Sequence, residues 1–328
     1  MKKVLIIAAD QERLGATPGP HTFRPEHEAQ LREACGTEAE VMIATPEEAP
    51  PFYAEAEIVA TFPARMPDIS LLPNAKWLHS FSAGVDRILT PTVAESEVIL
   101  SNSRGVHATP IAEHIIAFML NFSRGFYKTF ENQQKHIWSK AQTLGELRDS
   151  RVLIVGMGEI GTEAARLAHA FGAHVHTMVR TARPAPEFVE KMGTSADLDT
   201  ELGQADFVVI TLPHTDETHH LFNKDKFALM KPTSVIINIG RGGIINEPDL
   251  VEALQNNVIA GAGLDVTEKE PLPADSPLWD MPNVIITPHH SGLSHRYMDR
   301  AIDLLSKNIK AYLADQKIPT QVDKKLGY

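Results

Sequence analysis

The stretch RVLIVGMGEIGTEAARLAHAFG, residues 151–172, decides the fold of this chain. An apolar run leads into Gly156, Gly158 and Gly161, and a segment of helical composition follows these glycines. In a G-x-G-x-x-G turn the first glycine permits the tight bend, the second lets the backbone approach a pyrophosphate, and the third lets helix and strand pack closely. The stretch therefore predicts a Rossmann domain that binds a dinucleotide. A glycine-rich turn without a ligand is the alternative.

A helix that opens within this motif would present the backbone N–H groups of Glu159 and Ile160 to the phosphates. From residue 151 onward, six short apolar runs alternate with helical stretches, which is the rhythm of a doubly wound parallel sheet. The runs are RVLIVG, HVHTMV, ADFVVIT, TSVIINI, VIAGAGLDV and NVIIT.

The N-terminal part of the chain shows the same rhythm, with the apolar runs KVLIIAA, EVMIAT, AEIVATF, AKWLHSF and EVILSN. Between two of them, PEHEAQLREACG begins with Pro25 and ends with Gly36, as a helix would. The chain is therefore expected to be an α/β protein with two doubly wound parallel-sheet domains. Residues 294–316 carry apolar side chains at helical spacing, and this terminal helix could return to the first domain.

Composition narrows the class of protein. The 328 residues carry a net charge of −11 without a basic run, so a nucleic-acid partner is not expected. The single cysteine, Cys35, excludes a disulfide framework and a cysteine-rich zinc site, and it fits a reducing cytoplasm. The apolar run at the N-terminus is too short for a signal peptide, and no segment reaches transmembrane length. A cytoplasmic protein without a membrane partner is expected.

The stretch HVHTMVRT, residues 174–181, stands where dinucleotide-binding proteins usually carry an acid. That acid lies about 20 residues beyond the glycines and binds the ribose hydroxyls. Here no carboxylate is present to repel a 2′-phosphate, whereas Arg180 can pair with one, Thr181 can donate a hydrogen bond, and Arg183 is nearby. The stretch predicts that NADP(H) is preferred over NAD(H). A solvated Arg180, in a protein that takes NAD(H) without the usual acid, is the alternative.

Three charged residues follow predicted strands of the nucleotide-binding sheet: Arg241 in INIGRGG, Glu270 in DVTEKEPLP and His289 in VIITPHHSG. Ligands of open α/β sheets bind at the carboxyl ends of the strands, so these residues are expected at the ligand site. Arg241 offers a fork for a carboxylate or a carbonyl group. A carboxylate at Glu270 would favour the imidazolium of His289, which could then protonate a carbonyl oxygen during hydride transfer.

Nearly the whole chain resembles the D-isomer-specific 2-hydroxyacid dehydrogenases, and within them the glyoxylate/hydroxypyruvate reductase-like and phosphoglycerate dehydrogenase-like members. The resemblance rests on the order and spacing of SFSAGVDRI, GMGEIG, LPHTDETHHLFN, INIGRG, DVTEKEPL and TPHHSG. It implies an oxidoreductase that transfers a hydride between NAD(P)H and a small 2-oxoacid or D-2-hydroxyacid, acting as a 2-ketoacid reductase. It also implies that Arg241, Glu270 and His289 form the catalytic triad.

The same resemblance implies further site residues. The substrate carboxylate would be bound by the loop residues Ser82, Ala83, Gly84 and Val85 and by Arg241. The cofactor would be lined by Leu212, Pro213, Ile239, Asp265 and His289. Among these, Asp265 would lie near the nicotinamide amide.

The resemblance also implies a flavodoxin-like substrate domain built from residues 1–101 and 292–328, and a dinucleotide-binding domain of residues 102–291. A homodimer is implied as well, with a dimerisation helix near residues 110–130. Considered by itself, the stretch IAEHIIAFMLNFSRGFYK is apolar on most of its circumference. That fits either an interdomain core helix or a helix packed against a second subunit.

Two stretches depart from the family pattern. His290 and Ser291 follow the catalytic histidine where glycines are common, and Pro110 stands at the entry to the long helix.

Trp138 is expected to pack in a core or interface, with a role in the neighbouring subunit's active site as the alternative. Arg296 is expected to be solvated, with a second contact to the substrate carboxylate as the alternative.

The remaining histidines match no zinc spacing, so no metal site is expected. They are His107, His114, His214, His219 and His220. A short-chain dehydrogenase is excluded because no tyrosine has a lysine four residues on. A non-enzymatic NAD(H)-sensing regulatory protein on the same scaffold is the alternative function.

Overall fold

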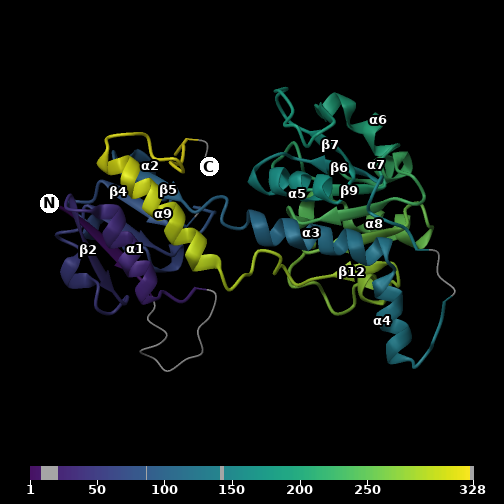
Figure 1. Ribbon diagram of the computed structural model, residues 1–328, viewed down its shortest axis with the longest axis horizontal. Coiled ribbons are helices and arrows are strands. Elements are labelled where there is room, and N and C mark those ends of the chain that lie inside the picture. Colours follow the sequence, from purple (N-terminus) through teal and green to yellow (C-terminus); the bar gives the residue numbers. More distant parts are fainter. Residues whose placement is uncertain (9–20, 86, 141–143, 326–328) are drawn as a thin grey trace. The chain divides into compact units, whose positions relative to one another are not determined.

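The computed structural model describes residues 1–8, 21–85, 87–140 and 144–325. The chain divides into two compact units (Figure 1). Unit 1 comprises Met1–His107 and Leu293–Tyr328, and unit 2 comprises Ala108–Gly292. Unit 1 is thus assembled from segments on both sides of unit 2 in the sequence.

Unit 1 is built on a five-stranded parallel sheet in the order β2-β1-β3-β4-β5, the flavodoxin-like order. Its strands are β1 (Lys2–Ile7), β2 (Ala39–Ala44), β3 (Ile58–Thr61), β4 (Trp77–Ser80) and β5 (Ile99–Asn102). The short apolar runs of the N-terminal part form these strands because both faces of the sheet are buried, which suits continuous apolar segments. The predicted parallel sheet is confirmed here.

Helices α1 (Pro25–Cys35) and α9 (Tyr297–Leu313) lie side by side on one face of this sheet (Figure 1). Leu31 and Leu305 are completely buried in the core between helices and strands. Helix α1 begins with a proline and ends at Gly36, whose φ of +56° stops the helix, as its sequence predicts. The terminal helix therefore belongs to unit 1. The short helix α2 (Pro91–Glu95) precedes β5.

The segment after α9 continues unit 1 along its edge strand. Gln321 forms an isolated antiparallel bridge with Ser101, and the backbone N–H of Val322 donates to the carbonyl of Leu100 at 2.8 Å. The edge of β5 is therefore covered by the chain itself.

Unit 2 is built on a seven-stranded parallel sheet in the order β12-β11-β10-β9-β6-β7-β8, the doubly wound dinucleotide-binding arrangement. Its strands are β6 (Arg151–Val155), β7 (His174–Met178), β8 (Lys191–Gly193), β9 (Phe207–Ile210), β10 (Val235–Asn238), β11 (Gly261–Leu264) and β12 (Val284–Ile286). The six expected strands are present. The count of six was wrong by one, because the edge strand β8 is only three residues long and has no apolar run.

Two layers of helices cover this sheet. On one face α3 (Ala108–Ser123) packs against α5 (Glu159–Ala170), and on the other lie α6 (Leu198–Leu202), α7 (Lys224–Leu229) and α8 (Glu247–Gln255). Single 3-10 turns occur at Pro50–Phe52, Pro63–Arg65, Ile69–Leu71, Ser195–Asp197, Gly242–Ile244 and Pro277–Asp280. No described helix is both long enough and apolar enough to cross a bilayer.

The apolar stretch near residue 110 forms α3 and the separate helix α4 (Phe126–Gln134). Ile115 and Met119 of α3 are completely buried in the core of unit 2, so much of the apolar surface of α3 is used within the unit itself. Helix α4 projects beyond the sheet (Figure 1) and has no buried residue.

Candidate active site

The glycines of the turn between β6 and α5 occupy three different environments. Gly156 has a φ of +106°, a conformation that favours glycine. A Cβ on Gly161 would lie 2.1 Å from the carbonyl oxygen of Gly156, whereas a Cβ on Gly158 would meet no atom within 4 Å. The turn therefore combines a tight bend, close packing and an open approach. These features fit the pyrophosphate of a dinucleotide.

The first turn of α5 provides the N–H groups of Glu159 and Ile160, because the first four N–H groups of a helix have no intrahelical acceptor. Thr211, directly after β9, donates from Oγ1 to the carbonyl oxygen of Gly156 at 2.7 Å. This contact holds the glycine turn against the neighbouring strand. Nothing in the sequence around Thr211 signals it, because the two residues meet only through strand pairing.

At the carboxyl end of β7, Arg180, Thr181 and Arg183 are all exposed. The guanidinium of Arg183 donates from Nη2 to the carbonyl oxygen of Met157 at 2.6 Å, inside the glycine turn. Arg180 makes no side-chain hydrogen bond or ion pair within the described part of the chain. A basic, acid-free strand end therefore lies beside the turn.

His289 and Glu270 form a direct pair. Nδ1 of His289 lies 2.7 Å from Oε2 of Glu270, and the two side chains are 51% and 39% exposed. The other carboxylate oxygen of Glu270 accepts from the backbone N–H of Thr267 at 3.3 Å. A carboxylate in this place holds the Nδ1 proton and leaves Nε2 of the imidazole available to a ligand.

The third predicted catalytic residue stands apart from this pair. Arg241 is exposed and donates from Nη1 to the carbonyl oxygen of Gly240 at 2.7 Å. Among the described residues, no hydrogen bond or ion pair joins it to Glu270 or His289. Its backbone is fixed firmly, because a Cβ on the following Gly242 would lie 1.8 Å from the carbonyl oxygen of Thr267.

Asp265 is a buried carboxylate with every oxygen engaged. Its Oδ1 accepts from Thr287 Oγ1 at 2.6 Å and from the N–H of His290 at 3.0 Å, and its Oδ2 accepts from Ser291 Oγ at 2.5 Å. Burial raises the pKa of Asp265, but the hydrogen bonds from Ser291 and Thr287 outweigh it and lower the pKa overall. Asp265 is thus a fixed anion at the carboxyl end of β11.

His114 of α3 joins this network from the other side. Its Nε2 lies 3.0 Å from Thr287 Oγ1, and because that hydroxyl proton goes to Asp265, Nε2 must be the donor. Burial lowers the pKa of His114, the carboxylate of Asp265 raises it, and His290 lowers it further, with a net lowering. His114 is therefore a neutral donor at neutral pH.

One ring nitrogen each from His114 and His290 and one carboxylate oxygen of Asp265 all lie within 4.8 Å of one another, a spacing compatible with a metal ion. The sequence did not suggest this group, because its members come from opposite ends of unit 2. The Asp265 oxygens already accept at least five hydrogen bonds, so few lone pairs remain for a metal. The arrangement fits a hydrogen-bond network better than a metal centre.

The residues that the resemblance assigns to the cofactor also follow strands of the unit 2 sheet. Leu212 and Pro213 follow β9 and are accessible, whereas Ile239 follows β10 and is 5% exposed. Together with Asp265 and His289 they lie at the carboxyl edge of the sheet, where the glycine turn also lies. Unit 2 therefore brings its predicted cofactor residues to one edge.

In unit 1 the loop Ser82–Val85 directly follows β4. None of the backbone N–H groups of Ala83, Gly84 and Val85 has an acceptor in the part of the chain that the structure describes. A run of free N–H groups at a strand end is suited to binding a carboxylate.

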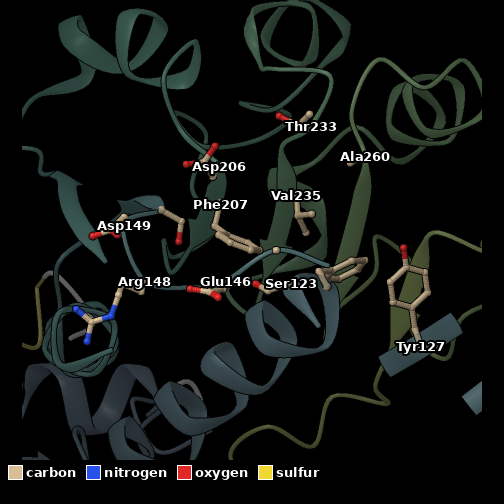
Figure 2. A pocket seen from close by; sticks show the side chains of 13 residues that line it. Ser123, Tyr127, Glu146, Arg148, Asp149, Asp206, Phe207, Thr233, Val235 and Ala260 are labelled. Carbon is tan, nitrogen blue, oxygen red and sulfur yellow. The ribbon is translucent and has the colours of Figure 1, made fainter. Parts of the chain in front are cut away.

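A hollow of about 520 Å³ lies at the opposite edge of the unit 2 sheet (Figure 2). Phe207 and Val235 line it at the amino ends of β9 and β10, and Tyr127 contributes from α4. Glu146 and Asp206 give it a partly acidic lining. Because the candidate site residues follow the carboxyl ends of the strands, this hollow is separate from the candidate active site.

The other residues singled out in the sequence lie on the surface. Trp138 is 94% exposed, so packing in the core of its own chain is the wrong interpretation for it. Arg296 is 67% exposed at the start of α9, as expected of a solvated residue. His214 pairs with His219 at 3.0 Å, and His220 pairs with Glu268 at 3.0 Å. His107 packs on Tyr297 within unit 1.

Comparison with known proteins identifies the family. Residues 116–291 match the model of the D-isomer specific 2-hydroxyacid dehydrogenase NAD binding domain. A glyoxylate/hydroxypyruvate reductase B of Pectobacterium carotovorum subsp. carotovorum is 37% identical over 251 residues, which are 73% of this chain and 78% of that protein.

Solved structures agree with this similarity. A D-isomer specific 2-hydroxyacid dehydrogenase family protein from Aeromonas salmonicida subsp. salmonicida has a TM-score of 0.80 and 31% identity, covering 98% of this chain and 99% of the other. An NADPH-dependent glyoxylate/hydroxypyruvate reductase from Sinorhizobium meliloti, in complex with NADP and sulfate, has a TM-score of 0.76 and 31% identity, with both chains covered completely.

These similarities agree with the dinucleotide-binding sheet of unit 2. They support the predicted oxidoreductase and give no support to the NAD(H)-sensing regulatory protein. The chain belongs to the D-isomer-specific 2-hydroxyacid dehydrogenase family and is an NAD(P)-dependent enzyme of that family.

Proposed function

We propose that this enzyme reduces glyoxylate to glycolate, or hydroxypyruvate or a similarly small 2-oxoacid to its D-2-hydroxyacid, with NADPH as its preferred cofactor. The observation that carries the proposal is the pair of His289 and Glu270, 2.7 Å apart at the carboxyl edge of a dinucleotide-binding sheet. The relatives named for glyoxylate and hydroxypyruvate reduction support this choice of substrate.

In this mechanism His289 donates a proton from Nε2 to the carbonyl oxygen of the substrate. Glu270 stabilises the imidazolium and fixes its orientation through Nδ1. Arg241 turns its guanidinium from the Gly240 carbonyl to the substrate, which it orients and polarises. The backbone N–H groups of Ala83–Val85 bind the substrate carboxylate. When bound, NADPH supplies the hydride.

Asp265 and the glycine turn hold the cofactor. The Gly158 backbone is open to the pyrophosphate, and the N–H groups of Glu159 and Ile160 lie at the positive end of α5. The anion at Asp265 would accept a hydrogen bond from the nicotinamide amide. Leu212, Pro213 and Ile239 would supply apolar contacts to the cofactor.

The preference for NADPH rests on Arg180, with Thr181 and Arg183 beside it. Arg183 is engaged with the Met157 carbonyl, so Arg180 has the freer guanidinium for a 2′-phosphate. A charge-assisted hydrogen bond contributes about 1.5–3 kcal/mol, and its loss would weaken NADPH binding roughly 10- to 150-fold. NADH binding would barely change, because NADH carries no phosphate there.

A panel of 2-oxoacids with NADPH and NADH tests the proposed function, together with the Arg180→Ala variant. We expect turnover of glyoxylate or hydroxypyruvate by the wild type, and a selective loss of NADPH affinity in the variant. The Arg166→Ala variant, on the exposed side of α5, is the matched control. Equal losses with both cofactors would contradict the phosphate contact, and no turnover of any 2-oxoacid would contradict the reaction.

We further propose a homodimer formed through α4 and the segment after it. Phe126 and Phe130 are 45% and 55% exposed with their rings stacked, and Ile137 and Trp138 are 51% and 94% exposed. Such a row of exposed apolar side chains is typical of an interaction surface. In such a dimer, Trp138 could reach the active site of the neighbouring subunit. We also propose that the enzyme acts in the cytoplasm.

Light scattering at micromolar concentration tests the dimer. We expect the mass of two chains for the wild type and a shift toward one chain for Phe130→Glu. Leu293→Glu, a substitution at another exposed apolar residue, is the control that should stay dimeric. A wild-type protein with the mass of one chain and full activity would contradict the proposal.

A further inference from the structure

The loop after β4 exposes N–H groups, and its conformation is imposed by the neighbouring strand. The backbone N–H of Ser103 donates to the carbonyl oxygen of Ser82 at 3.1 Å. The side chain of Asn102 donates from Nδ2 to the carbonyl oxygen of Ala83 at 2.7 Å. Two successive loop carbonyls are thus bound from the carboxyl end of β5.

These two contacts determine where the loop N–H groups point. In a trans peptide the carbonyl C=O and the following N–H lie in one plane and point in opposite directions across the C–N bond. Binding the Ser82 carbonyl therefore directs the N–H of Ala83 away from β5, and binding the Ala83 carbonyl directs the N–H of Gly84 the same way. The N–H groups of Ala83 and Gly84 therefore remain free, because the carbonyl of the same peptide unit is in each case bound on the opposite side.

Asn102 is in turn fixed by the segment after α9. Thr320 Oγ1 donates to the carbonyl oxygen of Asn102 at 2.6 Å, and the Asn102 N–H donates to the carbonyl oxygen of Thr320 at 3.3 Å. Asn308 of α9 donates from Nδ2 to Thr320 Oγ1 at 2.8 Å. Asn102, Asn308 and Thr320 are 3%, 0% and 5% exposed. A buried chain of hydrogen bonds therefore runs from α9 to the loop.

A purely structural role would explain one buried amide. The chain of hydrogen bonds described above, however, ends at a loop whose own N–H groups have no acceptor among the described residues. Fixed N–H groups bind an anion better than mobile ones, because less conformational freedom is lost on binding. We propose that Asn102 is a positioning residue for the substrate carboxylate, and that Thr320 and Asn308 hold Asn102 in place. This inference rests on the proposed function, in which the loop binds a 2-oxoacid.

The Asn102→Asp variant tests the inference, since it keeps the size of the side chain and replaces the donor by an acceptor facing the Ala83 carbonyl. Losing a buried donor and leaving that carbonyl unpaired should raise KM for glyoxylate and Kd for oxamate by about 10-fold. We expect kcat to fall by less than about threefold, and Kd for NADPH to stay within about twofold, because Asn102 makes no contact with the candidate cofactor residues.

Asn74→Asp is the matched control, because Asn74 also donates from Nδ2 to a backbone carbonyl in unit 1, that of Ala54 at 2.7 Å. A loss of fold in Asn102→Asp would appear as a lowered thermal midpoint and weakened NADPH binding. In that case Thr320→Val serves as the second variant, since it keeps the shape of the side chain and removes the hydroxyl that donates to the Asn102 carbonyl and accepts from Asn308. It should raise the same two constants by about threefold.

Oxamate binding to the NADPH-loaded protein, measured by calorimetry, separates this inference from the proposed function. Turnover by the wild type with unchanged KM and oxamate Kd in Asn102→Asp overturns the inference and leaves the function intact. Oxamate binding that weakens in Asn102→Asp, in a protein that reduces no 2-oxoacid, supports the inference and overturns the function. A protein that neither turns over 2-oxoacids nor binds oxamate overturns both.

Discussion

Two histidines, one in each unit, show how differently this fold treats the same side chain. His289 of unit 2 is half exposed, and within the described residues its side chain forms one hydrogen bond, with Glu270. His79 of unit 1 is completely buried, and its nitrogens lie 2.7 Å from Ser101 Oγ and 3.2 Å from Ser103 Oγ.

The hydrogen bonds around His79 run in a single direction. Trp77 donates to Ser101 Oγ at 2.7 Å, so the Ser101 hydroxyl donates to Nδ1 of His79. Ser103 Oγ donates to the Ser80 carbonyl at 3.0 Å, so it accepts from Nε2. Burial lowers the pKa of His79 to about 3. The contrast teaches that solvent access and unused hydrogen-bonding capacity, more than residue type, separate an acid–base residue from a structural one.

The largest effect should come from removing the exposed histidine. His289→Ala should lower kcat by about 10²- to 10⁴-fold, because the proton donor to the carbonyl oxygen is lost. The free energy of unfolding should hardly change, because the side chain is half exposed. Steady-state kinetics and urea unfolding measure both, with His295→Ala as the control at another exposed histidine. Turnover near that of the wild type would remove the acid–base role.

The buried histidine should respond in the opposite way. His79→Leu removes the acceptor of the buried Ser101 hydroxyl proton and the N–H that donates to Ser103 Oγ, which should lower the free energy of unfolding by about 2–4 kcal/mol. At pH 7 and a temperature well below the thermal midpoint of the variant, kcat should stay within about threefold of the wild-type value, since His79 takes no part in the proton transfer. His169→Leu, at an exposed position on α5, should leave stability nearly unchanged. A catalytic defect without a stability defect would reverse the comparison.

Acidification should sharpen the contrast further. The pKa of His79 is about 3 in the folded chain and about 6.5 when exposed, so only the unfolded chain takes up the proton between these values. His79 therefore contributes stability that is fully present above pH 6.5 and is lost as the pH falls toward 3. At pH 5 this loss is about 2 kcal/mol. The stability difference between wild type and His79→Leu should shrink by that amount from pH 7 to pH 5; a constant difference would contradict it.

The smallest effect concerns His114, which is intermediate between these two histidines. Its one hydrogen bond reaches the Asp265 carboxylate through Thr287. Losing this neutral donor should cost about 1 kcal/mol, so His114→Leu should weaken NADPH binding by about fivefold. Fluorescence titration with NADPH measures this, and Thr287→Val should show a loss that is not additive with it. Strict additivity would show that the two residues act separately.

The sequence was most informative where chemistry depends on position along a strand. Arg241, Glu270 and His289 each follow a strand, and parallel strands bring their carboxyl ends to one edge, so their shared location could be predicted. The glycine turn was equally predictable, because Gly156 has a positive φ, Gly161 leaves no room for a Cβ, and Gly158 keeps the approach to the backbone open. The two parallel sheets followed from the rhythm of apolar runs, whereas the flavodoxin-like substrate domain was implied by the family resemblance.

Contacts between distant segments could not be predicted in this way. The link from His114 to Asp265 depends on how α3 lies on the sheet, which no local pattern encodes. Strand β8 is too short and too polar to be recognised. Asn102 and Thr320 meet only because the chain returns to unit 1 after α9. Each of these features depends on tertiary packing, which hydrophobic periodicity does not specify.

The discontinuity of unit 1 has a consequence for how the protein is made. Unit 2 is continuous in the chain, so it can fold as soon as Gly292 has left the ribosome, and domains generally fold as units during synthesis. The sheet of unit 1 is synthesised first, yet its helix α9 and Thr320 arrive last. At the stage when Gly292 emerges, unit 2 is complete, while the residues that hold the loop after β4 are still within the ribosome or not yet added.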